Sequence, residues 1–178
     1  MGLTHNLKQA VKLPAGEDLN EWLAAHVLDF YNRTNLLFGA IEEYCDEESF
    51  PEMTAGPSYI YYWQDEKTKK AMPVPARKYV DLLFTWMTSK FDDESLFPTD
   101  SSTPFPKNFG EVISTMFKRM FRVYAFIYVH HFKKMQELEL EAHLNSVFKH
   151  FLFFIYEFNL VEKKEFAPIQ SLVDNFTK

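Results

Sequence analysis

Cysteine and glycine are scarce in this sequence of 178 residues, which holds one cysteine, Cys45, and five glycines. A single thiol excludes an internal disulfide and fits a reducing compartment. So little glycine argues against a chain built mostly of tight turns. Nineteen phenylalanines instead indicate long regular elements around a large aromatic interior. The length suits one domain covering residues 1–178.

Long hydrophobic runs are also missing. Apolar runs such as FLFFIY at Phe151–Tyr156 are far shorter than the roughly 20 residues that a membrane-spanning helix needs. The N-terminus does not combine a cationic start, an apolar run and a small-residue cleavage site. We therefore expect no membrane partner and a cytoplasmic or nuclear location, or both.

Motifs of known enzyme classes are missing too. The sequence contains no HExxH, no glycine-rich phosphate loop and no Gly-x-Ser-x-Gly. Its histidines could be combined with Glu137 or Glu139 into a hydrolytic metal site, but no standard ligand spacing supports this. We predict no catalytic residue, and a small metalloenzyme stays the least favoured alternative. The histidines weighed are His26, His130, His131, His143 and His150.

The net charge of −6 argues against general nucleic-acid binding, and the charges are unevenly distributed. Residues 17–52 carry ten acidic side chains and one basic side chain, Arg33. Residues 67–122 carry ten basic and six acidic side chains. One chain therefore presents an acidic and a basic surface, which suggests two charged partners of different kinds.

Hydrophobic periodicity predicts a mainly α-helical bundle with one short β-hairpin. Residues 1–13 lack a strong period, so we expect an extended N-terminal arm. The first predicted helix begins at Asp18, is interrupted, and resumes over Leu36–Tyr44. The other predicted helices run from Pro75 to about Lys90, from the N-cap Asn108 to about Met135, over Leu140–Phe158 and over Glu165–Phe176. The predicted hairpin pairs Tyr59–Trp63 with Ala71–Val74, and the helix after Asn108 is the expected centre of the bundle.

The helix after Asp18 has two distinct faces. Leu19, Leu23, Val27 and Phe30 form an apolar stripe that we expect in the core. Asp18, Trp22, Ala25 and Asp29 share another face, with Glu21 beside them. This second face is either a solvated surface with a half-buried tryptophan or a docking site for a basic helical partner.

Three cations lie at helical spacing in the segment FKRMFRVY. Lys118 and Arg122 are four residues apart, and Arg119 precedes Arg122 by three, so all three side chains fall on one patch of a helix. The patch is either a solvated helix face or a site for a doubly charged oxyanion, because guanidinium groups bind phosphate with two hydrogen bonds.

Several strings resemble the Mob family, closest to the Mob-one type, over about Leu7–Val173. They are LPAGEDLNEWLA, KYVDLLFTWM, DDESLFPTDSSTPFPKNF, KRMFRVYAFIY, EAHLNSVFKHFLFF and EFNLVEKKEFAPIQ. The resemblance implies a Mob-type bundle and a non-catalytic co-activator. Such a protein binds the N-terminal region of NDR/LATS-type kinases and phosphothreonine in an upstream kinase or scaffold. It implies roles in Hippo signalling, mitotic exit and cytokinesis, at spindle poles or the division site. A divergent phosphopeptide-binding bundle with changed partners is the alternative.

The resemblance also assigns residues. Arg33 stands where relatives carry an uncharged amide. The family's phosphothreonine-binding positions are Lys118, Arg119 and Arg122, with Lys69 and Lys70 as possible neighbours. Its kinase-binding positions are Glu17, Asp18, Glu21, Trp22, Ala25, Asp29 and His150.

The family's structural zinc is where this sequence departs. The four ligand positions of the resemblance are Cys45, Phe50, Phe126 and His131, so two nitrogen or sulfur donors remain. Phenylalanine cannot bind zinc, and structural zinc needs four donors. We therefore expect no metal cofactor. His130 and Glu48 are the side chains that could replace the missing ligands, but we do not expect either to do so. We predict that the Phe50 ring covers Phe126, which the helical wheel puts outside the core arc, and that the helix is irregular near residues 129–131.

Overall fold

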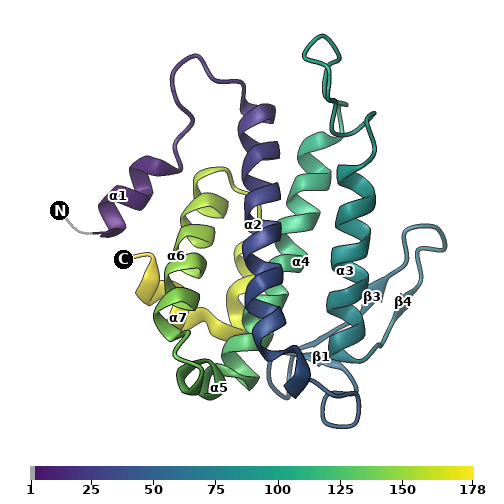
Figure 1. Cartoon of the computed structure of the whole chain (residues 1–178), viewed down its shortest axis with the longest axis vertical. Coiled ribbons are helices and arrows are strands. Elements are labelled where there is room, and N and C mark those ends of the chain that lie inside the picture. The colour runs from purple at the N-terminus through teal and green to yellow at the C-terminus, as the bar shows by residue number, and fades with distance from the viewer. Residues whose placement is uncertain (1–2) are drawn as a thin grey trace.

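The computed structural model describes residues 3–178 and is mainly α-helical, as predicted (Figure 1). The α-helices are α1 (Leu3–Ala10), α2 (Leu19–Ile41), α3 (Ala76–Phe91), α4 (Phe109–His130), α5 (Phe132–Glu137), α6 (Glu141–Glu157) and α7 (Gln170–Phe176). The 3-10 helix η1 (Glu42–Tyr44) directly follows α2, and the 3-10 helix η2 (Lys163–Ile169) directly precedes α7.

Helix α1 shows that the prediction of an extended arm at residues 1–13 is wrong. Leu7 packs on the core, and Val11 is 1% exposed. The amide of Val11 donates to the carbonyl oxygen of Leu7, which continues the helical turn beyond Ala10. Eight residues give too short a period for sequence reasoning, and the contact of α1 with α6 stabilises it instead. Residues 1 and 2 lie outside the described residues.

Helix α2 runs without the interruption expected before Leu36. Its first turn is capped by Asp18, whose Oδ2 accepts a 3.0 Å hydrogen bond from the amide of Glu21. Leu19 was expected in the core, but it is 44% exposed. Burial along this stripe begins with Leu23, one turn later.

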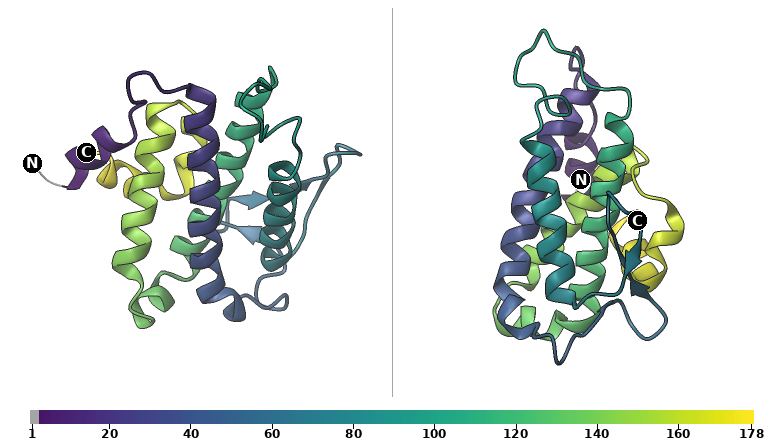
Figure 2. Two further views of the ribbon diagram at one scale, coloured as in Figure 1. Left: turned by 45° about the horizontal axis from the view of Figure 1, so that its top comes forward. Right: turned by 90° about the vertical axis from the view of Figure 1, so that its right-hand side faces the viewer.

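The bundle is built around contacts of α2, α4 and α6, and α3 packs on α4 at one side (Figures 1 and 2). Phe30 of α2, Phe117 of α4 and Phe151 of α6 form the junction. Their ring centroids lie 5.9 Å apart for Phe30 and Phe117, 5.4 Å for Phe117 and Phe151, and 5.5 Å for Phe30 and Phe151. All three side chains are completely buried. Aromatic rings at these separations add attraction to the burial of apolar area.

The central helix α4 ends earlier than predicted. His131 has φ −132° and ψ 14°, so the helix stops at His130 and resumes as α5 at Phe132. This break confirms the predicted irregularity near residues 129–131. Asn108 is the N-cap residue of α4, as predicted, although its side chain makes no hydrogen bond to the first turn.

The structure confirms a short hairpin, but the first strand of the hairpin begins at Trp63, later than predicted. Strand β3 (Trp63–Gln64) is antiparallel to β4 (Ala71–Met72), with Trp63 opposite Met72. Strand β1 (Met53–Thr54) pairs with β2 (Ile60–Tyr61), so this part of the first predicted strand pairs with an earlier segment and not with Ala71–Val74. At the other end of the chain, Pro168 lies inside η2, so the predicted terminal helix is divided.

A buried hydrogen bond between α2 and α4 gives the first test. The hydroxyls of Thr34 and Tyr124 lie 2.7 Å apart, and both residues are completely buried. We expect Tyr124→Phe to lower the free energy of unfolding by about 1–3 kcal/mol, because the Thr34 hydroxyl loses its partner. Adding Thr34→Val should recover part of this loss, as seen in urea unfolding. If the double variant loses as much free energy of unfolding as Tyr124→Phe and Thr34→Val do separately when added together, the two hydroxyls are not coupled and the account is contradicted.

Candidate functional site

The acidic surface lies at the start of α2. We use this name for Glu17, Asp18, Glu21 and Asp29, all of which are exposed, together with exposed Ala25. These residues face solvent because the apolar stripe from Leu23 onward turns the opposite side of α2 into the core. The predicted kinase-binding positions on α2 are therefore accessible in the structure.

Trp22 is half-buried and supports this surface from one side. Its indole Nε1–H donates a 3.0 Å hydrogen bond to the carbonyl oxygen of Val11, just after α1. Its ring lies 4.2 Å from that of His26, which stacks on Phe154 at 4.6 Å. Trp22 therefore ties the start of α2 to the chain after α1 and to α6, and only part of its ring can meet a partner.

His150 of α6 joins the acidic surface through Arg33. Arg33 Nη2 donates to Asp29 Oδ2 at 2.9 Å and to Nδ1 of His150 at 2.8 Å. The guanidinium also lies 4.7 Å from the centre of the Phe30 ring. Burial and, to a smaller extent, the charge of Arg33 lower the pKa of His150 to about 4, so the imidazole is neutral at pH 7. Two predicted kinase-binding residues, Asp29 and His150, thus both contact the guanidinium of Arg33.

The basic surface contains a hollow of about 290 Å³. We call it the basic hollow, and Lys69, Lys118 and Arg119 are among the residues that line it. The Arg119 guanidinium lies 4.7 Å from the Trp63 ring and 4.6 Å from the Trp86 ring, which fixes it between two aromatic faces. Burial, and then the charge of Arg122, lower the pKa of Lys118. The hollow therefore gathers four cations from the hairpin, α3 and α4, beside the carboxylates of Asp65, Glu66 and Glu111.

Arg122 has a different environment from its two neighbours. Its Nη1 donates to the hydroxyl of Tyr79 at 2.9 Å, and its Nη2 lies 3.7 Å from a Glu165 carboxylate oxygen. The guanidinium also lies 4.9 Å from the Tyr61 ring. Neither Arg122 nor Lys70 is among the residues lining the basic hollow. The structure thus brings together three of the five predicted phosphothreonine-binding residues around this hollow.

The predicted contact between Phe50 and Phe126 is confirmed. Their ring centroids lie 5.4 Å apart at 76°, and the Phe50 ring lies 4.9 Å from His131. We call these three residues the aromatic plug. Phe126 is completely buried rather than outside the core arc, because the loop carrying Phe50 covers it. Beside the plug, the Cys45 sulfur lies 3.3 Å from His131 Nε2 and 3.3 Å from the carbonyl oxygen of Ile41.

The family's zinc does not fit these residues. Cys45 and His131 supply two donors, and phenylalanine rings stand at the other two positions that the resemblance assigns. Nε2 of His130 is 2.9 Å from the Thr54 hydroxyl, and Glu48 is exposed. In the part of the chain that the structure describes, no cluster of three or more His, Cys, Asp or Glu residues is arranged to hold a metal ion.

Cys45 does not have the properties of a nucleophile. Its side chain is completely buried, and burial raises the pKa of the thiol to about 12. At neutral pH the sulfur is therefore a neutral thiol, whereas nucleophilic cysteines react as thiolates. These properties fit a small packed side chain.

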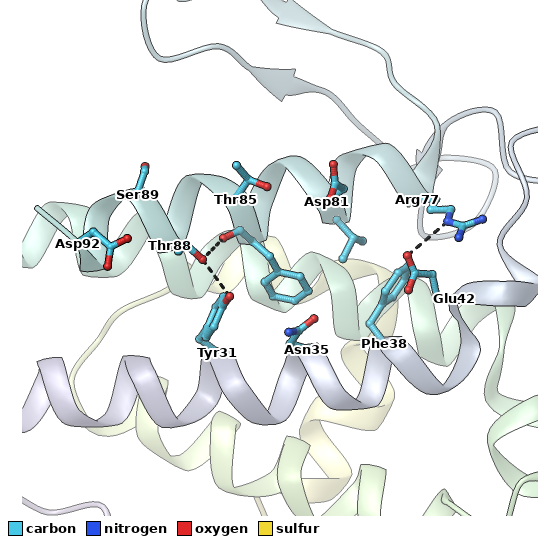
Figure 3. A pocket seen from close by; sticks show the side chains of 12 residues that line it. Tyr31, Asn35, Phe38, Glu42, Arg77, Asp81, Thr85, Thr88, Ser89 and Asp92 are labelled. Atoms are coloured by element: carbon cyan, nitrogen blue, oxygen red, sulfur yellow. Dashed lines mark hydrogen bonds and ion pairs between the residues drawn. The ribbon is translucent and has the colours of Figure 1, made fainter.

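A further hollow lies between α2 and α3, which sequence analysis did not predict (Figure 3). It measures about 480 Å³. Near one end, the hydroxyls of Tyr31 and Thr88 lie 3.0 Å apart, and at the other end Arg77 Nε is 3.4 Å from Glu42 Oε1 (Figure 3). These contacts link the two helices, and the ion pair uses one of the carboxylates that line the hollow.

Comparison with known proteins agrees with this architecture. The family model described as the Mob1/phocein family matches residues 2–169. The chain belongs to the Mob1/phocein family. Among curated relatives of this Mob1/phocein chain, "MOB kinase activator-like 1 homolog A" of Dictyostelium discoideum is 53% identical over 174 residues, covering 97% of this chain and 82% of the relative.

Plant relatives are equally similar. "MOB kinase activator-like 1B" of Medicago sativa subsp. falcata is 54% identical over 171 residues, which cover 96% of this chain and 80% of the relative. "MOB kinase activator-like 1A" of Arabidopsis thaliana is 52% identical with the same coverage. Within the described residues of this Mob1/phocein chain, none of the helices has the length and apolar character needed to cross a membrane.

The aromatic plug can be tested by truncation and by chelation. We expect Phe50→Ala to lower the free energy of unfolding by about 2–3 kcal/mol, because it uncovers Phe126 and removes buried apolar area. The exposed Tyr59→Ala, measured in the same urea titration, should change it by less than about 1 kcal/mol.

The same account predicts that a chelator leaves the wild-type unfolding midpoint unchanged. In contrast, Phe50→Cys combined with Phe126→His supplies four donors in place of two, so this variant should bind one zinc ion and become sensitive to chelator. Stoichiometric zinc in purified wild-type protein, measured by elemental analysis, would overturn the prediction.

Proposed function

We propose that this Mob1/phocein protein is a non-catalytic adaptor and kinase co-activator. It binds the N-terminal region of an NDR/LATS-type kinase through the acidic surface and a phosphothreonine peptide through the basic hollow. The observation that carries the proposal is the placement of these opposite charges on separate elements. The acidic surface lies at the start of α2, and the hollow lies among the hairpin, α3 and α4. The names of its relatives as kinase activators support the same role.

The acidic surface suits a basic helical segment. Glu17 and Glu21 are exposed around the start of α2, and Trp22 adds part of an aromatic face. Carboxylates around an aromatic side chain attract a basic partner and give it an apolar contact. His150 extends this surface onto α6, so a partner segment could contact two helices at once.

The basic hollow suits a doubly charged oxyanion. Lys118 and Arg119 line it together, and stacking between two tryptophans holds the Arg119 guanidinium in place. A phosphothreonine carries a charge of about −1.5 to −2 at pH 7 and three acceptor oxygens, which such cations bind strongly. We infer that phosphorylation of an upstream kinase or scaffold controls whether that protein recruits this Mob1/phocein protein.

A second candidate function is phosphopeptide binding with changed partners. The pairing of Arg33 with Asp29 favours it, because this pair reduces the negative charge of the acidic surface. In either case we propose action in the cytoplasm or nucleus, including spindle poles and the division site during mitotic exit and cytokinesis. We propose neither nucleic-acid nor membrane partners.

Glu21 gives the cleanest test of the kinase surface, since Asp18 also caps α2. We expect Glu21→Lys to abolish capture of a purified NDR/LATS-type N-terminal fragment, because the reversed charge repels its basic residues. The matched control is Glu94→Lys, which reverses an exposed charge in the loop after α3. Phosphopeptide affinity should be unchanged in both variants. Loss of both activities in a folded Glu21→Lys protein would argue against two separate surfaces.

For the basic hollow, we expect Lys118→Ala to weaken binding of a phosphothreonine peptide by about tenfold or more, because a charge-assisted contact is lost. Arg119→Lys should also weaken it, since lysine keeps the charge but loses the planar fork. Exposed Lys107→Ala serves as the control. Fluorescence anisotropy at two salt concentrations gives the affinities, which should fall as salt rises. Equal affinity for the unphosphorylated peptide would exclude this assignment.

A further inference from the structure

Arg33 is held on three sides at the edge of the acidic surface. Its Nη2 is shared between Asp29 Oδ2 at 2.9 Å and His150 Nδ1 at 2.8 Å, and its guanidinium packs on Phe30. The side chain is 26% exposed, whereas that of Asp29 is 53% exposed. Among the described residues, Arg33 Nε is buried without a hydrogen-bond partner. The guanidinium therefore occupies one fixed position between α2 and α6.

This contact divides the acidic surface into two parts. At the first part, Glu17 and Glu21 are exposed and have no ion pair within the described structure. At the second part, the charges of Asp29 and Arg33 cancel. The two parts are about 12 Å apart, since Glu21 and Asp29 are separated by eight residues of helix at about 1.5 Å each.

The same contact sets the hydrogen-bonding groups of His150. An arginine only donates, so Nδ1 of His150 must accept and cannot carry a proton. In the neutral ring the proton then resides on Nε2. A partner segment over this part of the surface meets a neutral imidazole and a neutralised ion pair, and neither attracts a lysine or arginine.

We propose that Arg33 determines partner selectivity at this surface. With Arg33 in place, the surface accepts a partner segment that has one basic cluster over Glu17 and Glu21 and is neutral over Asp29 and His150. The inference rests on the proposed function, because it assumes that a basic segment docks on α2. It adds the charge pattern of that segment. A partner with a second basic cluster about 12 Å from the first gains little from Asp29, since Arg33 already occupies that carboxylate.

Two synthetic helical peptides test this pattern. One carries a single lysine cluster, and the other carries a second pair of lysines eight residues away. We expect wild-type protein to bind both with affinities within twofold. Arg33→Gln should bind the two-cluster peptide about threefold to fivefold more tightly than the one-cluster peptide, because Asp29 is released for an ion pair. Arg33→Gln combined with Asp29→Asn should remove this preference, and Glu21→Lys should weaken both peptides.

A second readout does not depend on the peptides. Nitrogen chemical shifts of the His150 ring should show an unprotonated Nδ1 and a protonated Nε2 in the wild-type protein. Arg33→Gln should shift the Nδ1 signal, because the charged donor is replaced by a neutral amide. A proton on Nδ1 in wild-type protein would overturn the proposed geometry.

The peptide outcomes separate the two proposals. If both peptides bind in a Glu21-dependent manner but Arg33→Gln leaves their affinity ratio unchanged, the selectivity role is wrong and the docking surface stands. A preference that persists after Asp29→Asn also rules out this role, since the carboxylate would not be its source. If neither peptide binds, or if Glu21→Lys has no effect, the kinase-binding surface fails and the inference fails with it.

Discussion

The contact of α2 and α6 with α4 through aromatic rings is the constraint on which the rest of the structure depends. Phe117 contributes a ring from α4 to the junction that also contains Phe30 and Phe151. Because these rings fix the inward faces of the three helices, they also decide which side chains face outward. The acidic side chains of α2 and the cations of α4 are therefore held apart by the same core that joins their helices.

Local periodicity located the long helices, although not every limit of α2 and α4, and it was insufficient for the short elements. The structure places α3 at Ala76–Phe91, close to its predicted limits, because many turns repeat one apolar pattern. Helix α1 is too short to carry such a pattern, and its contact with α6 stabilises it. Ile60 and Tyr61 lay within a predicted strand, but the pattern did not reveal that they pair with Met53–Thr54. The break at His131 was predictable, because the ligand spacing that the resemblance implies does not fit a regular helix.

The candidate sites were predictable as sets of charges but not as sets of contacts. Lys118, Arg119 and Arg122 lie close together on one helix, yet Arg122 contacts Tyr79 and Glu165 while Arg119 stacks on two tryptophans. These partners belong to other elements, so helical spacing does not reveal them. The bond from Arg33 to His150 likewise joins residues 117 positions apart. Its role follows from the packing of α6 beside α2.

The aromatic sandwich around Arg119 has a consequence for the energetics of anion capture. A free arginine side chain loses roughly 2 kcal/mol of conformational entropy when a ligand immobilises it. Between Trp63 and Trp86 this ordering already takes place during folding. An anion entering the hollow would therefore meet a preorganised cation, and more of the interaction energy would remain as affinity. The two tryptophans thus influence binding without having to touch the ligand.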